Sequence, residues 1–509
     1  MLLPARVYTF IILLLGALGS TSARTRAQDW PTFRGDAQRS AFYPQFPAGK
    51  LQLAWRKELY RELTGPRAEV IVAQGRAYLG TYAGVLYAWD VANGAERWRV
   101  QTAGPIGHSV AFAEGTIFCA SMDGTLRALA ADTGEPRWLF QAGSGIWVAP
   151  LVAHGLVFFG ARDGKFHALD ERTGEPRWVV ETGGPILQSA ALAEAGDRVL
   201  VTSEDMHLYC FERATGKLLW KSRKLAGLSA RDYAPVIARD LAFVTTNPTK
   251  DFHTILSQHE EMLVKRTGFT GRDKRYIPGT ETDVVAEQDA IVRFLREHPE
   301  EQTFYVFRIS DGTEPWIAPI LYTGGLHNPH SPPCVNRETG EVFVQLRSAY
   351  GTWDGGGEVR PFTCFGRLDP KTGRVPLIGH GFPSKEAGRP PGAKDMPWMT
   401  FNYIGDETQT LSCARGRLFS NHQGFLGAFD LRSGLTASLF GKRDTYAGFY
   451  GPGTFGWENR GGVTKARAAK QPYGLVNEWH GPAKGVASVA GEHVFYHTGS
   501  QVLCYRGDD

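Results

Sequence analysis

The chain has 509 residues, of which 56 are Lys or Arg and 52 are Asp or Glu, so its formal net charge is +4. This balance gives no electrostatic basis for binding nucleic acid or an anionic surface, and we expect neither as a partner. The length exceeds that of most single domains, but a repeat architecture closed into one ring can reach it.

Residues 1–27 have the pattern of a secretory signal peptide. Arg6 supplies a positive charge, residues 9–18 form a short apolar core, and small residues follow, so we expect cleavage after Ala23 or Ala27. The core is too short for a transmembrane helix, and no later stretch could span a bilayer, although an uncleaved anchor is the alternative. Removal of this segment lowers the net charge to +1. We therefore expect a periplasmic or extracellular protein comprising residues 28–509.

A repeat of about 40 residues is the strongest signal in the chain. Trp98, Trp138, Trp178 and Trp220 follow one another at intervals of 40, 40 and 42 residues. Each ends a strand that returns from a tight turn, and the clearest copy is Ala-Leu-Asp-Glu-Arg-Thr-Gly-Glu-Pro-Arg-Trp at 168–178. Units of this period with about four short strands predict an all-β propeller.

The pattern Ala-x-Asp-x-x-Thr-Gly-x-x-x-Trp resembles the tryptophan-docking repeat of the pyrroloquinoline quinone (PQQ)-like propeller family. Residues 168–178 match it at every position, and the other copies depart at one or two. The segment Asp-Trp-Pro-Thr-Phe-Arg-Gly-Asp at 29–36 also resembles the opening of many exported members of the family. The resemblance implies that structural tryptophans wedge between neighbouring blades, at Trp55, Trp98, Trp138, Trp178, Trp220 and Trp316.

The two ends of the chain each carry an incomplete blade. Residues 51–56 read as an outer strand without partners, and 486–489, 493–497 and 501–505 read as three strands without a fourth. We expect Leu51–Leu59 to pair with the strand near Gln501–Tyr505, which closes the ring and removes its open edges. The count is then eight blades. Seven is the alternative, because the sixth and seventh repeats lack the tryptophan.

Four insertions interrupt the repeats. Residues 247–303 separate the second and third strands of blade five and carry two helical stripes, the second ended by Pro299. Residues 351–361 occupy the same point of blade six, and 379–403 and 441–482 connect blades. Up-and-down blades place all four on one face, opposite the Thr-Gly turns, and such loops usually carry function. We expect residues 247–303 to form a helical cap over the ligand-facing mouth, with simple decoration as the alternative.

Alignment of the first strands predicts a polar and aromatic ring at one rim of the channel. Such a ring suits a small polar ligand or a peptide segment, and a water-filled channel mouth is the alternative. The ring contains Arg67, His108, Trp147, Gln188, Asp232, His330, Gln409 and Lys484.

A metal site is a weaker hypothesis. His327, His330 and Cys334 have metal-like spacing, but three prolines in this stretch suit a stiff loop, and a fourth ligand is missing. We therefore assign no metal ligands. The cysteines at 119, 210, 364, 413 and 504 lie in apolar strand patterns and are expected to be buried free thiols.

Two functional hypotheses follow from the resemblance. One is a PQQ- and calcium-dependent quinoprotein dehydrogenase of alcohols or sugars, with both cofactors in the funnel. The sequence lacks the adjacent cysteine pair and the Cys-x-x-Cys-His haem site of such enzymes, and no calcium ligands can be matched. The favoured hypothesis is an exported, monomeric binding or scaffold module without catalytic residues, which engages a ligand or protein partner on its loop-rich face.

Overall fold

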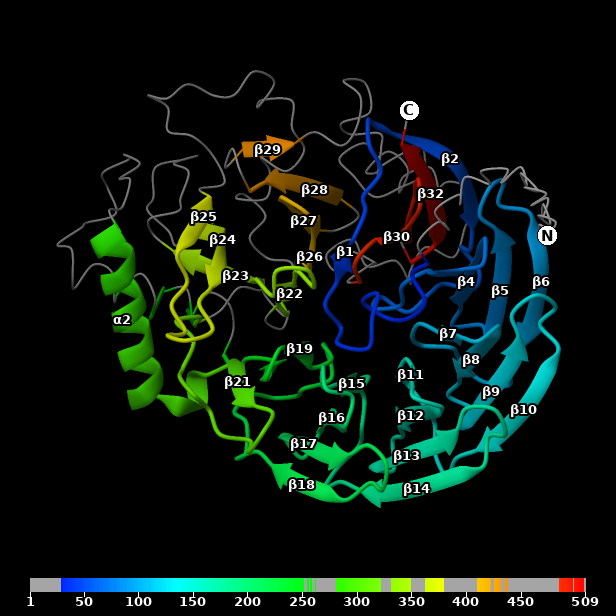
Figure 1. Cartoon of the computed structure of the whole chain (residues 1–509), viewed down its shortest axis with the longest axis horizontal. Coiled ribbons are helices and arrows are strands. Elements are labelled where there is room, and N and C mark those ends of the chain that lie inside the picture. The colour runs from blue at the N-terminus through cyan, green and yellow to red at the C-terminus, as the bar shows by residue number, and fades with distance from the viewer. Residues whose placement is uncertain are drawn as a thin grey trace, which may run out of the picture.

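The computed structural model describes residues 29–250, 281–321, 331–348, 362–379, 410–422, 425–431, 435–437, 485–497 and 499–507, with Thr254, Ile255, Ser257, Gln258 and Glu261. These residues form eight sheets arranged as blades around a ring, which Figure 1 views along the ring axis. The prediction of an eight-bladed, all-β propeller is therefore confirmed. Within the described residues, no helix is long and apolar enough to cross a membrane.

Blades one to four are regular four-stranded antiparallel sheets, each ordered from the channel outward. Blade one contains β3 (Ile71–Ala73), β4 (Arg76–Gly80), β5 (Val85–Asp90) and β6 (Glu96–Gln101). Blade two contains β7 (Ala111–Ala113), β8 (Thr116–Ala120), β9 (Thr125–Ala130) and β10 (Pro136–Gln141). Blade three contains β11 (Leu151–Ala153), β12 (Leu156–Gly160), β13 (Lys165–Asp170) and β14 (Pro176–Glu181). Blade four contains β15 (Ala191–Leu192), β16 (Arg198–Ser203), β17 (His207–Glu212) and β18 (Leu218–Lys221).

The second half of the ring is less regular. Blade five has three described strands, β19 (Val236–Ala238), β20 (Leu241–Thr245) and β21 (Phe304–Arg308). Blade six contains β22 (Cys334–Val335), β23 (Val342–Ser348), β24 (Phe362–Leu368) and β25 (Leu377–Gly379). Blade seven contains β26 (Thr410–Ala414), β27 (Arg417–His422), β28 (Phe425–Asp430) and β29 (Leu435–Ala437), and a fifth strand, β1 (Phe42–Tyr43), pairs in parallel with β26.

Blade eight joins the two ends of the chain. It contains β30 (Ser488–Ala490), β31 (His493–His497) and β32 (Gln501–Gly507), and β2 (Leu51–Glu58) completes it as the outermost strand. Strands β2 and β32 are antiparallel, with Leu53 opposite Tyr505 and Glu58 opposite Gln501. The predicted closure is confirmed, and it pairs the edge of β32 that would otherwise be open.

The six repeat tryptophans join neighbouring blades by the same two contacts. Each indole lies on the glycine of the next blade's turn, and each indole N–H donates to a main-chain carbonyl of that turn. For Trp178, the carbonyl belongs to Arg213 at 3.0 Å, and a Cβ at Gly216 would come within 2.7 Å of the ring. The pairs are Trp55 with Gly94, Trp98 with Gly134, Trp138 with Gly174, Trp178 with Gly216, Trp220 with Gly312 and Trp316 with Gly373.

The insertion in blade five provides one described helix of several turns, α2 (Glu281–Glu297), followed by a 3-10 turn, η1 (Pro299–Glu301). Strands β20 and β21 pair across it, so the predicted insertion point is correct. The expected cap is wrong for α2, because this helix lies outside the ring beside β21 and β25 rather than over the mouth (Figure 1). Its apolar residues Ile291 and Leu295 pack with Ile255 and Leu321 at the outer rim.

The N-terminal segment, residues 29–43, runs inside the ring of inner strands (Figure 1). It contacts the blades in their own order, beginning with a bridge between Trp30 and Val72 of blade one. Its carbonyls then accept hydrogen bonds from the inner strands of blades two, four, five, six and seven, donated by the amides of Phe112, Leu192, Ile237, Val335 and Cys413. Phe33 packs on Ala149 of blade three, and the Tyr43 hydroxyl donates to Ala487 of blade eight at 2.6 Å.

This arrangement solves an edge problem that every propeller has at its centre. The inner strand of each blade has one edge without a strand partner, and unpaired amides there are costly when buried. The N-terminal segment pairs with these amides and fills the channel at the level of the strands. It does so with three non-glycine residues in the left-handed region, Arg34, Arg39 and Ala41, at φ of 57°, 61° and 54°. Such conformations persist only where surrounding contacts over-determine them.

Candidate functional site

Five of the eight predicted rim residues lie in the described part of the chain. Arg67, His108, Trp147, Gln188 and Asp232 each precede the inner strand of one of the first five blades, so the topology places them at the same end of the channel. His330, Gln409 and Lys484 lie outside the described residues. The ligand-binding ring therefore stays a prediction, with five of its eight members described.

An ion pair bridges the mouth. The Arg67 guanidinium of blade one contacts the Asp232 carboxylate of blade five, and the two side chains are 18% and 6% exposed. Blades one and five are opposite in an eight-bladed ring, so this pair spans the channel. Burial lowers the pKa of Arg67 to about 10, which leaves the guanidinium charged at neutral pH. A charged contact thus bridges the described part of the mouth.

A neutral histidine lies beside this ion pair. The Nδ1 atom of His108 accepts a hydrogen bond from the Ser109 amide at 2.8 Å, which places the proton of the neutral ring on Nε2. Burial, followed by the positive charges of Arg67 and Arg39, lowers the pKa of His108 to about 3, against the weaker opposing effect of the neighbouring Gln188 side chain. Both guanidinium groups therefore lie near the imidazole, and His108 stays neutral over the physiological pH range.

Gln188 and Trp147 complete the described part of the mouth. The Gln188 amide donates to the Arg231 carbonyl at 3.1 Å and accepts from the Ser189 amide at 2.7 Å, so it ties blade four to blade five. Trp147 stacks on Tyr82 of blade one with ring centroids 5.8 Å apart. A Cβ at Gly107 would come within 2.7 Å of the Trp147 ring, so glycine is needed there for the indole to lie flat across blade two.

The floor of the mouth is the N-terminal segment, which sequence reasoning did not place there. The Phe33 ring meets the edge of His108 at 4.5 Å and 87°. The Arg34 guanidinium donates to the carbonyls of Arg39 at 2.8 Å and Pro333 at 2.6 Å. Arg39 donates to the carbonyls of Ala190 at 2.9 Å and Phe33 at 2.8 Å. Both arginines are almost fully buried, at 1% and 0% exposure, and both hold the segment to the blades.

Glu69 anchors this floor to blade one. Its carboxylate accepts hydrogen bonds from the Arg34 amide at 2.7 Å, the Trp30 indole at 3.1 Å and the Val486 amide of blade eight at 3.1 Å. Burial raises the pKa of Glu69 to about 7, although these donors and the Arg34 charge act in the opposite direction. Glu69 thus links the N-terminal segment, blade one and blade eight through one titratable group.

Three buried N–H donors at this mouth have no hydrogen-bond partner among the described residues. They are Nη2 of Arg39, Nε of Arg67 and Nε2 of His108. Since both arginines act on the pKa of His108, the three groups lie in one region. Buried donors without partners are costly, and the usual solution is a water molecule or a ligand acceptor. The arrangement suits the oxygen of a carboxylate or another polar acceptor.

The described residues do not fit a calcium-bound PQQ. No group of three or more His, Cys, Asp or Glu side chains that could hold a metal occurs in the part of the chain that the structure describes. The two carboxylates of the mouth are already used, Asp232 by Arg67 and Glu69 by the N-terminal segment. Of the weak metal candidates, Cys334 is buried in β22, and His327 and His330 lie outside the described residues. The other described cysteines, at 119, 210, 413 and 504, are buried and free.

Sequence reasoning found the rim residues because each precedes an inner strand at a similar offset. It missed Arg34, Arg39 and Glu69, which the structure places directly beneath them. The signal that could have found them is the stretch 29–36, where Trp30, Phe33 and Arg34 precede any strand of the repeat. A polar segment that contains large apolar side chains and no repeat of its own needs a buried surface elsewhere.

Comparisons with known proteins place the chain in a family. Residues 49–146 and 92–318 match the family described as the outer membrane protein assembly factor BamB. No functionally curated protein matches the sequence.

Solved structures share the fold at low sequence identity. The quinohemoprotein alcohol dehydrogenase ADHIIG from Pseudomonas putida HK5 has a TM-score of 0.53 and 14% identity, covering 95% of this chain and 81% of that chain. BamB from Moraxella catarrhalis has a TM-score of 0.41 and 15% identity, covering 73% of this chain and 94% of that chain. At 14% identity the likeness to the dehydrogenase shows the fold alone, and the likeness to BamB, with a TM-score below 0.5, carries no argument. Because the family match spans just over half of the residues, the chain belongs to the PQQ-like β-propeller family.

Proposed function

We propose that this chain is an exported binding or scaffold propeller that engages an acidic group of a ligand or protein partner at the channel mouth. The observation that carries the proposal is that Nη2 of Arg39, Nε of Arg67 and Nε2 of His108 are buried and have no hydrogen-bond partner among the described residues. The donors already lack water in the unbound protein. An acceptor that reached them would therefore form hydrogen bonds without a further desolvation cost to the protein, which favours binding.

The geometry beneath the mouth supports a binding role for the rim. The N-terminal segment occupies the channel at the level of the inner strands and pairs with six of them, which obstructs approach to the three donors from the other end of the channel. The stacked pair of Trp147 and Tyr82 lies beside this approach. A flat apolar surface next to buried cationic donors is the combination that interface hot spots commonly use. Export rests on the predicted signal, which lies outside the described residues.

Site-specific photo-crosslinking tests this role in the organism that makes the protein. A photoreactive phenylalanine at Trp147 is expected to trap one dominant partner, identified by mass spectrometry. The matched control carries the same group at Arg172, which is exposed in the turn on the opposite face of blade three. Adducts at both positions, or at Arg172 alone, would contradict binding at the mouth. Adding Arg67→Gln to the Trp147 probe should reduce the adduct, because it removes one of the donors.

The quinoprotein dehydrogenase is the alternative that this proposal excludes. Purified protein is mixed with PQQ and calcium, desalted, and measured for quinone absorbance and for dye reduction with alcohols or sugars. We expect no quinone retained in stoichiometric amount and no substrate-dependent reduction. Retention of PQQ together with dye reduction would replace the scaffold role by the enzyme.

A further inference from the structure

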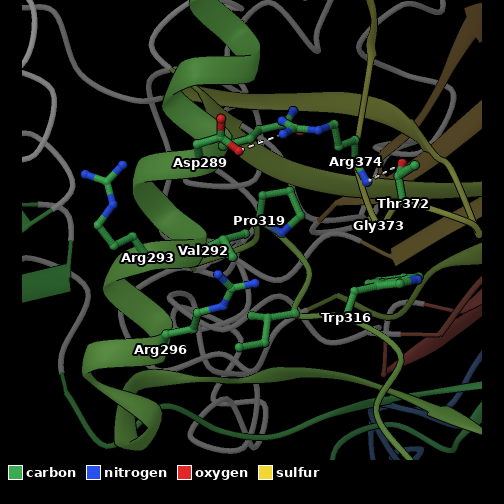
Figure 2. A pocket seen from close by; sticks show the side chains of 11 residues that line it. Asp289, Val292, Arg293, Arg296, Trp316, Pro319, Thr372, Gly373 and Arg374 are labelled. Atoms are coloured by element: carbon green, nitrogen blue, oxygen red, sulfur yellow. Dashed lines mark hydrogen bonds and ion pairs between the residues drawn. The ribbon is translucent and has the colours of Figure 1, made fainter.

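A cavity of about 340 Å³ lies between helix α2 and the junction of blades five and six, far along the rim from the channel mouth. Figure 2 shows it from close by. Its volume is in the range of small-molecule sites. Its walls come from α2, from the chain around Trp316 and from the turn of blade six, and its main lining residues are Asp289, Val292, Arg296, Trp316, Pro319 and Arg374.

The helix is fixed against the blades by specific contacts. The Gln288 side chain is buried and pairs with both main-chain groups of Val375, accepting from its amide at 3.0 Å and donating to its carbonyl at 2.7 Å. Arg374 forms an ion pair with Asp289 at 2.7 Å. These contacts fix the orientation of the helix. One of its faces therefore lines or borders the cavity, with residues three or four positions apart, namely 289, 292, 293 and 296.

The charge of this site is positive and only partly compensated. Asp289 is the one acidic lining residue, and it is engaged by Arg374. Arg293 and Arg296 have no acidic partner within the described ranges. In Figure 2, Arg296 extends from the helix toward Pro319 and Trp316, whereas Arg293 extends away from them. Arg296 is therefore the cationic group available inside the cavity, and Arg293 adds positive charge at its border.

The remaining walls offer a flat, largely apolar surface. The indole of Trp316 lies over Gly373, and its N–H donates to the Pro370 carbonyl at 3.2 Å, so the ring is held in one orientation. Val292, Ile317 and Pro319 add apolar contacts beside it. The corresponding turn of blade three, at 170–175, has an arginine at 172 and no described helix against it. The cavity therefore arises from the insertion and not from the repeat.

We propose that this cavity binds a small organic anion, with a carboxylate or phosphate on Arg296 and a flat or apolar body against Trp316, Val292 and Pro319. The guanidinium of arginine matches both acidic groups with two parallel hydrogen bonds. The fixed indole supplies the apolar contact area that orients the rest of the molecule. This site is independent of the channel mouth, so either one can fail without the other.

Titration with defined probes tests the proposal on the full-length mature protein. Benzoate and phenyl phosphate represent the two acidic groups, inorganic phosphate lacks the body, and benzyl alcohol lacks the charge. Calorimetry measures binding, and fluorine NMR of protein labelled with 5-fluorotryptophan reports the site, with the Trp316 signal assigned from Trp316→Phe. We expect benzoate or phenyl phosphate to bind saturably and to shift the Trp316 signal, and both other probes to bind more weakly.

Substitutions then separate a built site from general attraction to a basic surface. Arg296→Gln should weaken binding by about 10- to 100-fold, the effect of a hydrogen bond to a charged group. Arg293→Gln should weaken it only a few-fold, and Arg172→Gln, at the uncovered turn, should leave it unchanged. All three arginines are exposed, so the variants should fold. The proposal is overturned if neither aromatic anion shifts the Trp316 signal in the millimolar range, or if Arg296→Gln binds the aromatic anion as tightly as the parent protein does.

Discussion

Two additions to the repeat differ sharply in how they join the ring. The N-terminal segment, residues 29–43, lies inside the channel, where it pairs with the inner strands of six blades and buries Arg34 and Arg39. Helix α2 lies on the outer rim, where the hydrogen bonds of Gln288 to Val375, one ion pair and a small apolar cluster hold it. The first addition completes hydrogen bonds that the ring itself leaves open, and the second covers a surface that is already complete.

This difference indicates which parts are needed for folding and which are free to serve binding. A segment that satisfies buried strand edges cannot leave without exposing several amides at once. A helix on the rim can open locally while the blades stay paired. Four predictions, in order of decreasing effect, test this division between the N-terminal segment and helix α2.

Deleting residues 29–43 should have the largest effect. At least six inner-strand amides would lose their bonds, and the channel would be left empty, so we expect the protein to lose cooperative thermal unfolding. The matched control replaces 248–302 by a short Gly-Ser linker and should keep the β signal in circular dichroism and a single transition. Equal melting temperatures for the deletion and the parent protein would show that the N-terminal segment is dispensable.

Substitution of a blade-joining tryptophan should come next. Trp178→Ala removes an indole that is 9% exposed and its hydrogen bond to Arg213, and should lower the free energy of unfolding by about 3–5 kcal/mol. Trp147→Ala removes one stacked pair at the mouth and should lower it by only about 1 kcal/mol. Urea denaturation measures both. Similar losses at the two positions would contradict the structural role of the first and the surface role of the second.

Glu69, which holds the N-terminal segment to blade one, should make the free energy of unfolding depend on pH in a recognisable way. Burial raises the pKa of Glu69 to about 7 in the folded state, above the usual 4.5, so the unfolded chain loses this proton first as pH rises. The stability that Glu69 contributes is thus present below about pH 4.5 and lost as pH rises to 7, by about 3 kcal/mol in all.

The Glu69→Gln variant lacks this titration. Comparing it with the parent protein therefore isolates the pH dependence of Glu69 from the opposite pH dependence of buried histidines. His108, whose pKa falls to about 3, lowers stability as pH drops below 6.5, and it does so in both proteins. The parent should therefore exceed Glu69→Gln in stability by more at pH 4.5 than at pH 7.5. Urea titrations at both pH values measure this, and a difference that is constant or grows with pH would refute the assignment.

The smallest effect should come from removing the Gln288 side chain, which holds α2 against blade six. Gln288→Ala leaves the amide and carbonyl of Val375 without their partners, which should weaken helix docking by about 1–3 kcal/mol. Hydrogen exchange should report faster opening of residues 281–297 and little change in the inner strands. Global destabilisation in this variant would mean that the helix belongs to the core of the fold.

The repeat made most of the ring predictable. The tryptophan spacing and the orphan strands at both ends led to eight blades and to the pairing of β2 with β32. The positions of Arg67, His108, Gln188 and Asp232 before inner strands also followed from the repeat, whereas their role in binding stays a prediction. Local periodicity was sufficient for these inferences, since each depends on the position of a residue within one blade.

Contacts between distant parts of the chain could not be read in the same way. The bond from Arg34 to Pro333 joins residues 299 positions apart, and the pairing of Arg67 with Asp232 depends on the width of the ring. The apolar stripe of 283–298 predicted a helix correctly, but such a stripe does not say which surface it covers. For α2, the expected cap over the mouth was wrong, because Gln288 and Ile291 find their partners on the outer rim instead.

Native-state hydrogen exchange followed by mass spectrometry tests the central claim most directly, that the N-terminal segment is part of the fold. The amides of Trp30 and Ala41, within the segment, donate hydrogen bonds to the carbonyls of Val72 and Arg34. The amides of Phe112, Ile237 and Cys413, in the inner strands, donate to carbonyls of the segment. We predict that peptides containing these amides exchange only through global unfolding, more slowly than residues 281–297 of α2. Exchange of residues 29–43 within seconds, at the rate of an unprotected loop, would contradict the account.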